Sequence, residues 1–253
     1  MELGLSGKTV LVTGATGDLG GTIARAFHAA GARVALGYGR GAEAAEELAR
    51  ELGEDRGLAL AVPTPLGDPE TLGNSVDLVT GRWGGIDVLV TAAADRVPPR
   101  RPGAHFEDVA AADWTRFLQD NLFGTVHAVQ RVLPGMRERG WGRIVLLSSQ
   151  AVHEGKQGAE IYTASKAALH GLARALTWDT APDGVLLNLV APGMTLTGKV
   201  LGKLPEHIRK GEESRAPSGR LSTPQQVADT VLFLASEANG NISGESVTIA
   251  GGR

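Results

Sequence analysis

The chain has 253 residues, no cysteine and a formal net charge of −3, and 42% of its residues are hydrophobic. The lack of cysteine excludes disulfides, thiolate metal sites and a cysteine nucleophile. The slight negative charge argues against binding to nucleic acid, because the phosphate backbone attracts basic proteins. The hydrophobic content is too high for a disordered chain.

The N-terminal residues lack the basic and apolar regions of a signal peptide. The apolar runs are far shorter than the ~20 residues that a membrane-spanning helix needs. We therefore expect a cytoplasmic protein, with neither a membrane nor a nucleic acid as its partner.

Short apolar or β-rich runs alternate with helix-like segments along the whole chain. We predict strands at Thr9–Thr13, Arg33–Tyr38, 58–62, Val88–Thr91, 143–147, 185–190 and 247–250. We predict helices at 19–30, 42–52, 114–139 and 164–179, among others, and a surface loop at the Pro- and Arg-rich segment 97–103. This alternation predicts an α/β fold, a single Rossmann-type doubly wound domain over residues 1–253, with about seven parallel strands and helices on both faces.

The first predicted strand leads directly into a glycine-rich turn. Gly14, Gly17 and Gly20 are spaced three residues apart and lie just before an amphipathic helix. Such a turn lets backbone amides approach a pyrophosphate at the helix N-terminus. Glycines that only allow a tight turn and close packing are the alternative, but the strand–turn–helix context favours a nucleotide.

Ribose selection is expected at the end of the second predicted strand. An acidic residue there would bind the 2′-hydroxyl of NAD, but the sequence has Tyr38 and no acid before Glu43. Arg40 lies close by, and its guanidinium can pair with the 2′-phosphate of NADP. Arg40 could also be an ordinary solvated loop residue. The sequence favours NADP (NADPH) over NAD.

Tyr162 and Lys166 are four residues apart and share one face of a predicted helix. An ammonium one turn away stabilises a phenolate, which makes a phenol a usable proton donor to a carbonyl oxygen. A Tyr–Lys pair at this spacing often arises by chance, so the neighbouring motifs decide its meaning. Upstream, Ser149 ends a predicted strand at the edge where ligands bind, and Pro192-Gly193 follows another strand.

The order of these motifs resembles the short-chain dehydrogenase/reductase family, in its short single-domain branch. The resemblance covers nearly the whole chain, residues 8–252. It rests on the glycine-rich turn, on Asn121-Leu-Phe-Gly124, on Ser149, on Tyr162 and Lys166, on Pro192-Gly193, and on a tail from Arg220 to Gly252.

The resemblance implies a carbonyl–alcohol oxidoreductase with four catalytic residues. Tyr162 would be the general acid in reduction and the base in oxidation, and Lys166 would support it and hold the nicotinamide ribose. Ser149 would orient the substrate oxygen, and Asn121 would anchor a water in a proton relay. Asn121 could instead satisfy backbone groups at a helix kink, and Ser149 could be a plain strand-end hydroxyl.

The resemblance also implies residues that contact the cofactor and the substrate. The cofactor set is Gly14, Thr16, Gly17, Asp18, Leu19, Tyr38, Arg40, Leu66, Ala92, Ala93, Tyr162, Lys166, Pro192, Gly193, Thr195 and Thr197. Thr195 and Thr197 could instead belong to a solvated loop. Substrate contacts are expected from Ser149, Tyr162 and His153. The remaining histidines show no metal-ligand spacing, so no metal is expected.

Three positions depart from the family pattern, all in the nucleotide half. Asp18 stands where glycine is usual, and Thr91-Ala-Ala-Ala94 replaces an Asn-containing turn. Pro65 replaces an aspartate that usually contacts adenine. An acid beside a pyrophosphate is repulsive unless it points away. We expect an active enzyme with a modified cofactor pocket.

The segment 194–217 is predicted to be a lid over a small-molecule carbonyl substrate. Its residues Leu196, Val200, Leu201, Leu204 and Ile208 suggest a partly apolar substrate, although they could simply dock the lid. The resemblance implies a homo-oligomer, a tetramer or a dimer. Dehydration, epimerisation or double-bond reduction on the same scaffold, and a non-catalytic nucleotide sensor, are the alternative functions.

Overall fold

The computed structural model describes residues 2–95, 103–155 and 157–253. Seven parallel strands form one sheet in the order β3-β2-β1-β4-β5-β6-β7. The strands are β1 (Thr9–Thr13), β2 (Arg33–Tyr38), β3 (Ala59–Pro63), β4 (Val88–Thr91), β5 (Gly142–Leu147), β6 (Val185–Pro192) and β7 (Ser246–Ile249). The predicted doubly wound α/β fold is confirmed, and each predicted strand is present with small shifts of its ends.

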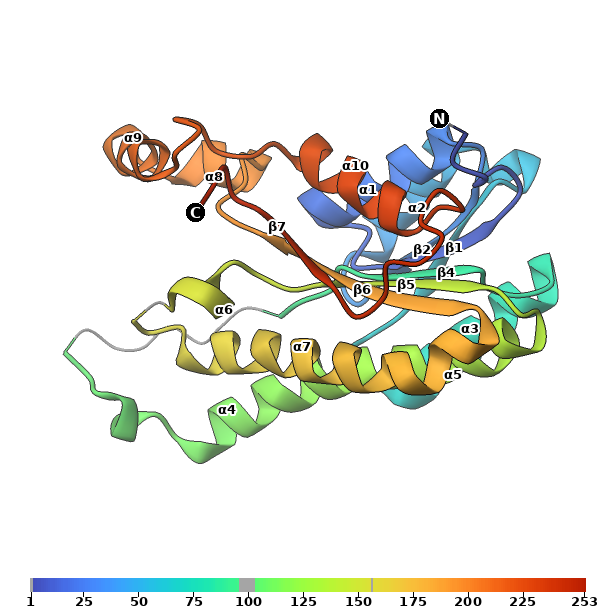
Figure 1. Ribbon diagram of the computed structural model, residues 1–253, viewed down its shortest axis with the longest axis horizontal. Helices are drawn as coiled ribbons and strands as arrows, with labels where there is room; N and C mark the ends of the chain where they lie inside the picture. The colour runs from blue at the N-terminus through green and yellow to red at the C-terminus, as the bar shows by residue number, and fades with distance from the viewer. Residues whose placement is uncertain (1, 96–102, 156) are drawn as a thin grey trace.

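Helices cover both faces of the sheet (Figure 1). The helices are α1 (Asp18–Ala29), α2 (Ala42–Glu51), α3 (Pro69–Trp83), α4 (Ala111–Leu118), α5 (Gly124–Glu138), α6 (Ala151–Glu154), α7 (Glu160–Thr180), α8 (Gly198–Lys203), α9 (Glu206–Arg215) and α10 (Pro224–Leu234). In Figure 1, α1, α2 and α10 lie above the sheet, and α3, α5 and α7 lie below it. The short helices α8 and α9 extend beyond the sheet at one end.

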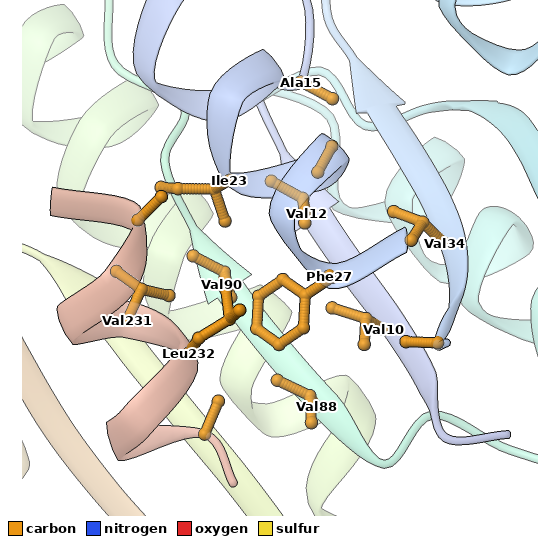
Figure 2. Close-up of a cluster of buried hydrophobic side chains, with 14 of the residues drawn as sticks. Val10, Val12, Ala15, Ile23, Phe27, Val34, Val88, Val90, Val231 and Leu232 are labelled. Atoms are coloured by element: carbon orange, nitrogen blue, oxygen red, sulfur yellow. The ribbon is translucent and has the colours of Figure 1, made fainter. Parts of the chain in front are cut away.

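Two hydrophobic clusters hold the layers together, one on each face. Val10 and Val12 of β1 point into the upper cluster and Leu11 into the lower one, as the two-residue period of a strand requires. Figure 2 shows the fully buried ring of Phe27 from α1 packed among side chains of β1, β4 and α10. Because both faces are covered, the central strands β1, β4, β5 and β6 are buried along their whole length and are mostly apolar, which is the pattern that the sequence displayed.

The prediction of one continuous α-helix over residues 114–139 is wrong. The chain instead forms α4, a π-helical turn at Gln119–Phe123, and α5. Gly124 follows the turn and packs against the 64–68 connection, where an added Cβ would lie 2.5 Å from the carbonyl oxygen of Leu66. The wider turn buries Asn121 against the β4 loop, and π-turns of this kind often occur at functional sites.

The predicted loop at 97–103 falls almost entirely outside the described residues. Within the described part of the chain, no helix is both long and apolar enough to cross a membrane.

Candidate functional site

A cleft of about 1090 Å³ opens at the carboxyl ends of the central strands. Parallel strands place all of their carboxyl ends at one edge, which is where ligands bind in open α/β sheets. The described residues that line it from the predicted set are Leu19, Ala92, Ser149, Tyr162, Lys166, Pro192, Gly193, Thr195 and Thr197. The fold thus brings together residues from the first, middle and last thirds of the sequence.

Tyr162 and Lys166 lie one turn apart on α7 and both face this cleft. The Lys166 ammonium is buried, and its Nζ donates a hydrogen bond to the carbonyl oxygen of Leu147 at 2.8 Å. Burial lowers the pKa of Lys166 to about 8, because a charged amine loses hydration in the protein interior. The contact with Leu147 anchors the face of α7 that carries Lys166 to the end of β5.

Ser149 lies two residues beyond β5, in the wall of the same cleft. Its Oγ accepts a hydrogen bond from the backbone N–H of Ala151 at 3.2 Å, at the start of α6. The hydroxyl proton remains available to a substrate oxygen, since Oγ acts only as an acceptor in this contact. The strand-end role and the substrate-orienting role of Ser149 are therefore compatible.

Asn121 is buried and bonds to backbone groups on two segments. Its Nδ2 donates to the carbonyl oxygen of Phe117 at 2.9 Å, and its Oδ1 accepts from the N–H of Asp95 at 2.8 Å. Both bonds fit the helix-kink alternative, and they tie the loop after β4 to the π-helical turn. In the described structure Asn121 is not part of the cleft lining. Its place in a proton relay stays a prediction.

The glycine-rich turn has the geometry of a cradle. Gly14 adopts a left-handed conformation with φ +68°, and an added Cβ would lie 2.7 Å from the backbone nitrogen of Ala93. A Cβ on Gly20 would lie 2.2 Å from the carbonyl oxygen of Gly14. The turn is therefore closed against the β4 loop and against its own helix, which leaves the N-terminus of α1 facing the sheet edge. This shape fits the pyrophosphate of a dinucleotide.

Asp18, which replaces the usual glycine, forms a hydrogen bond that joins the glycine-rich turn to the predicted lid. Its Oδ2 accepts a hydrogen bond from the backbone N–H of Lys199 in α8 at 3.2 Å. Thr197, two residues earlier, accepts from the N–H of Val200 at 3.2 Å and caps the same helix. Two side chains thus satisfy the first amides of α8, and the turn is tied to the predicted lid.

Two hydrogen bonds hold the loop after β4, where Thr91-Ala-Ala-Ala94 replaces the Asn-containing turn. The N–H of Ala93 donates to Thr13 Oγ1 at 3.3 Å, and the N–H of Asp95 donates to Asn121 as described above. These bonds fix the β4 loop without the missing amide side chain. Pro65 follows β3, and an added Cβ on Gly39 would be in ordinary contact with it at 3.7 Å.

Arg40 forms an ion pair with Asp95. The Arg40 side chain is 87% exposed and the Asp95 side chain 38% exposed. Arg40 follows β2 and Asp95 follows β4, so the pair lies at the carboxyl edge of the sheet, where the sequence analysis expects ribose selection. The sequence did not point to Asp95, because the two residues are 55 positions apart.

Several predicted contacts are not in the wall of the cleft. Among the described residues, its lining does not include Gly14, Thr16, Gly17, Asp18, Tyr38, Arg40, Leu66, Ala93, Asn121 or His153. His153 packs edge-on against His170 instead, with 5.9 Å between ring centroids. The short helix α6 turns that side chain toward α7, where His170 Nε2 contacts Ser148 Oγ at 2.7 Å. Burial, and then the neighbouring His153, lower the pKa of His170.

The predicted lid is less apolar toward the cleft than its sequence suggested. Val200 and Leu204 line the cleft, but Leu201 and Ile208 are largely exposed. Charged side chains missed by sequence reasoning complete the wall, and these are Glu154, Lys199, Lys203, Glu212, Arg215 and Arg253. No local signal marked them, since they meet only through the tertiary fold. In the described parts of the chain, no group of three His, Asp or Glu side chains is placed to hold a metal.

Comparisons with known proteins agree with this architecture. A family model described as enoyl-(acyl carrier protein) reductase matches residues 14–253. The 3-oxoacyl-acyl-carrier-protein reductase of Aquifex aeolicus is 35% identical, over 100% of this chain and 99% of that protein. The D-threitol dehydrogenase of Mycolicibacterium smegmatis is also 35% identical, over 98% and 93% of the two chains.

A solved structure of 7α-hydroxysteroid dehydrogenase, complexed with NADH and 7-oxo glycochenodeoxycholic acid, superposes with a TM-score of 0.89. It is 31% identical and covers 99% of this chain and 96% of its own. A second structure, a glucose/ribitol dehydrogenase of the short-chain type from Brucella melitensis, has a TM-score of 0.88 at 30% identity, covering 100% of this chain and 98% of its own.

Proposed function

Because the chain belongs to the short-chain dehydrogenase/reductase family, whose members are NAD(P)-dependent oxidoreductases acting on alcohols and ketones, we propose that it is an NADP(H)-dependent carbonyl reductase or alcohol dehydrogenase. One observation carries the proposal. Tyr162 and the buried Lys166 face one cleft together with Ser149, at the sheet edge where the glycine-rich turn also opens.

Each side chain has a defined task in this mechanism. The nicotinamide, when bound, gives or takes the hydride. Ser149 donates a hydrogen bond to the substrate oxygen and holds it beside the Tyr162 hydroxyl. Tyr162 transfers its proton to that oxygen in reduction and recovers it in oxidation. The Lys166 ammonium stabilises the phenolate that remains, and its bond to Leu147 fixes its position.

The cofactor residues are assigned by their place along the sheet edge. Gly14, Thr16, Gly17 and Leu19 surround the N-terminus of α1, where a pyrophosphate is stabilised by free amides. Ala92, Pro192, Gly193, Thr195 and Thr197 lie toward the nicotinamide, and Tyr38 and Leu66 toward adenosine. The preference for NADP rests on Arg40, whose exposed guanidinium can turn from Asp95 to a 2′-phosphate.

The proposal extends to the whole chain. Residues 1–253 form one domain, with residues 194–217 as the lid, and the enzyme works as a homo-oligomer. Large exposed apolar side chains support association, most clearly Trp178 on α7 at 88% exposure and Phe123 at 50%.

Double-bond reduction is the second candidate, because the matching family model is described as an enoyl reductase. The two reactions differ in where the proton goes. Carbonyl reduction needs a donor at the oxygen, and the Ser149–Tyr162 arrangement supplies one. The relatives, which are named as a 3-oxoacyl-acyl-carrier-protein reductase, a D-threitol dehydrogenase and a 7α-hydroxysteroid dehydrogenase, support the carbonyl reaction.

The proposed function is tested by following NADPH oxidation with matched ketones and enones. We expect consumption with ketones and formation of the corresponding alcohol. Consumption with enones alone, giving the saturated ketone, would favour the second candidate. Tight NADPH binding without turnover of either class would favour a nucleotide sensor.

A further inference from the structure

One wall of the cleft carries four charged side chains that join into a single network. We call Glu154, Glu212, Arg215 and Arg253 the charged wall, and all four line the cleft. Arg253 Nε and Nη2 donate to the two carboxylate oxygens of Glu154, each at 2.8 Å. Arg253 Nη1 donates to Glu212 Oε2 at 2.7 Å, and Arg215 Nη1 donates to Glu212 Oε1 at 3.2 Å.

The charged wall is preorganised by elements that are distant in sequence. Glu154 ends α6, Glu212 and Arg215 lie on α9 of the lid, and Arg253 follows β7. The Arg253 side chain is only 13% exposed and that of Glu212 21%, so both are held mostly away from solvent. Hydrogen bonds from Arg253 lower the pKa of Glu212, so that this carboxylate stays charged. Forked pairs of this kind fix geometry as well as charge.

The charged wall reaches the catalytic end of the cleft. Gln150, which directly follows Ser149, is buried and donates from Nε2 to Glu154 Oε1 at 2.7 Å. A chain of hydrogen bonds therefore runs from the neighbour of Ser149 through Glu154 and Arg253 to the lid. Lys199 and Lys203 of α8 also line the cleft, but no hydrogen bond joins their side chains to this network among the described residues.

The chemistry of the charged wall discriminates among substrates. The two carboxylates and two guanidinium groups of the charged wall carry no net charge together, so this wall by itself offers an anionic group no net attraction. An apolar substrate would remove water from these groups without replacing its hydrogen bonds, which is unfavourable. Hydroxyl groups can donate to the carboxylates and accept from the free N–H groups of the guanidinium ions.

We propose that the charged wall binds hydroxyl groups of the substrate, and that the substrate is a polyhydroxylated alcohol or its ketone. The inference rests on the proposed carbonyl–alcohol function and names its substrate class. The reacting carbinol lies between Ser149 and Tyr162, and further hydroxyls along the carbon chain lie against Glu154, Glu212 and Arg253.

The test compares alcohols in the oxidation direction, with NADP⁺ and with NAD⁺. Ribitol and xylitol represent polyols, cyclohexanol and 2-hexanol represent apolar alcohols, and 3-hydroxybutyrate represents an anionic one. We expect the highest kcat/KM for a pentitol. Glu212→Gln should raise the KM for that pentitol by about tenfold, the effect of weakening one hydrogen bond to a charged group, and change the KM for cyclohexanol less than twofold.

Glu213→Gln is the matched control, because Glu213 is the next residue of α9, pairs with Arg209 and is outside the cleft lining. It should leave both KM values unchanged. Glu154→Gln is a second variant with the same expectation as Glu212→Gln, and circular dichroism checks that both are folded. A preference for an apolar or anionic alcohol, or an equal change in KM for pentitol and cyclohexanol, would overturn the inference and leave the dehydrogenase function standing. Cofactor binding with no oxidation of any alcohol and no reduction of any ketone would overturn the proposed function as well.

Discussion

Polar side chains are held in different ways at the two ends of the candidate site, the proposed catalytic end around Lys166 and the proposed nucleotide end around Asp18 and Arg40. At the catalytic end, Lys166 and Asn121 bond to backbone carbonyls of neighbouring regular elements. At the nucleotide end, Asp18 and Arg40 are held by groups far away in sequence, Lys199 and Asp95. The Lys166 side chain therefore keeps its place with or without a ligand, whereas Arg40 has to leave Asp95 in order to bind a 2′-phosphate as proposed.

This difference fits the departures from the family pattern, which lie in the proposed nucleotide half and not among the residues proposed for catalysis. A side chain that bonds to a strand end has few alternatives, because the strand is buried on both faces. A side chain that only holds a loop can be replaced if another residue provides a hydrogen bond to that loop. Thr13 and Asn121 do this for the β4 loop.

The largest effect is expected at Tyr162. Tyr162→Phe removes the proposed proton donor but keeps the packing ring, so turnover should fall by roughly 10²–10⁴. NADPH affinity and the circular dichroism spectrum should stay the same, since no cofactor contact is attributed to the hydroxyl alone. Turnover of a true substrate at the wild-type rate would show that the catalytic end does not work as described.

A smaller effect is expected from the charge of Lys166. Burial holds its pKa at about 8, so the ammonium is present below that pH and is lost as the pH rises through it. A bound anionic cofactor favours the charged form, so NADPH affinity should decline as the pH rises through about 8. Fluorescence titrations across this range measure the decline. Lys166→Met should bind NADPH more weakly at neutral pH and lose the pH dependence, and an unchanged pH profile in that variant would assign the titration to another group.

The nucleotide end is tested by breaking the Arg40–Asp95 pair from each side. Arg40→Ala should weaken NADPH by about tenfold and NADH by much less, because only NADPH has a 2′-phosphate for the guanidinium. Asp95→Asn frees Arg40 and should tighten NADPH several-fold. Calorimetric titration of both variants with NADPH and with NADH gives the four dissociation constants, which are compared with those of the wild type. Equal losses for both cofactors in Arg40→Ala would remove Arg40 from ribose selection.

The smallest effect is expected at Asp18. Asp18→Asn keeps an acceptor for the Lys199 N–H and removes a negative charge beside the expected pyrophosphate. NADPH binding should tighten by about twofold at low ionic strength and not at high salt, since exposed charges are screened. A gain that persists at high salt would mean that the change acts through the lid contact instead.

The sequence by itself determined the sheet and the shared face of Tyr162 and Lys166. Continuous apolar runs at regular intervals require strands buried on both sides, and four-residue spacing alone places Tyr162 and Lys166 on one face of α7. The position of Ser149 followed from the same rule, because every strand of a parallel sheet ends at one edge. These are local or periodic properties, which a linear pattern can encode.

The tertiary structure alone decided the partners of the charged and polar side chains. Arg40 meets Asp95, Asp18 meets Lys199, and Arg253 joins Glu154 to Glu212 across 99 and 41 positions. At the π-helical turn that contains Asn121, Gly124 likewise packs closely against Leu66, which belongs to the connection between β3 and α3. Ion pairs and close approaches of this kind have no period, because they depend on where loops from separate crossovers meet in space.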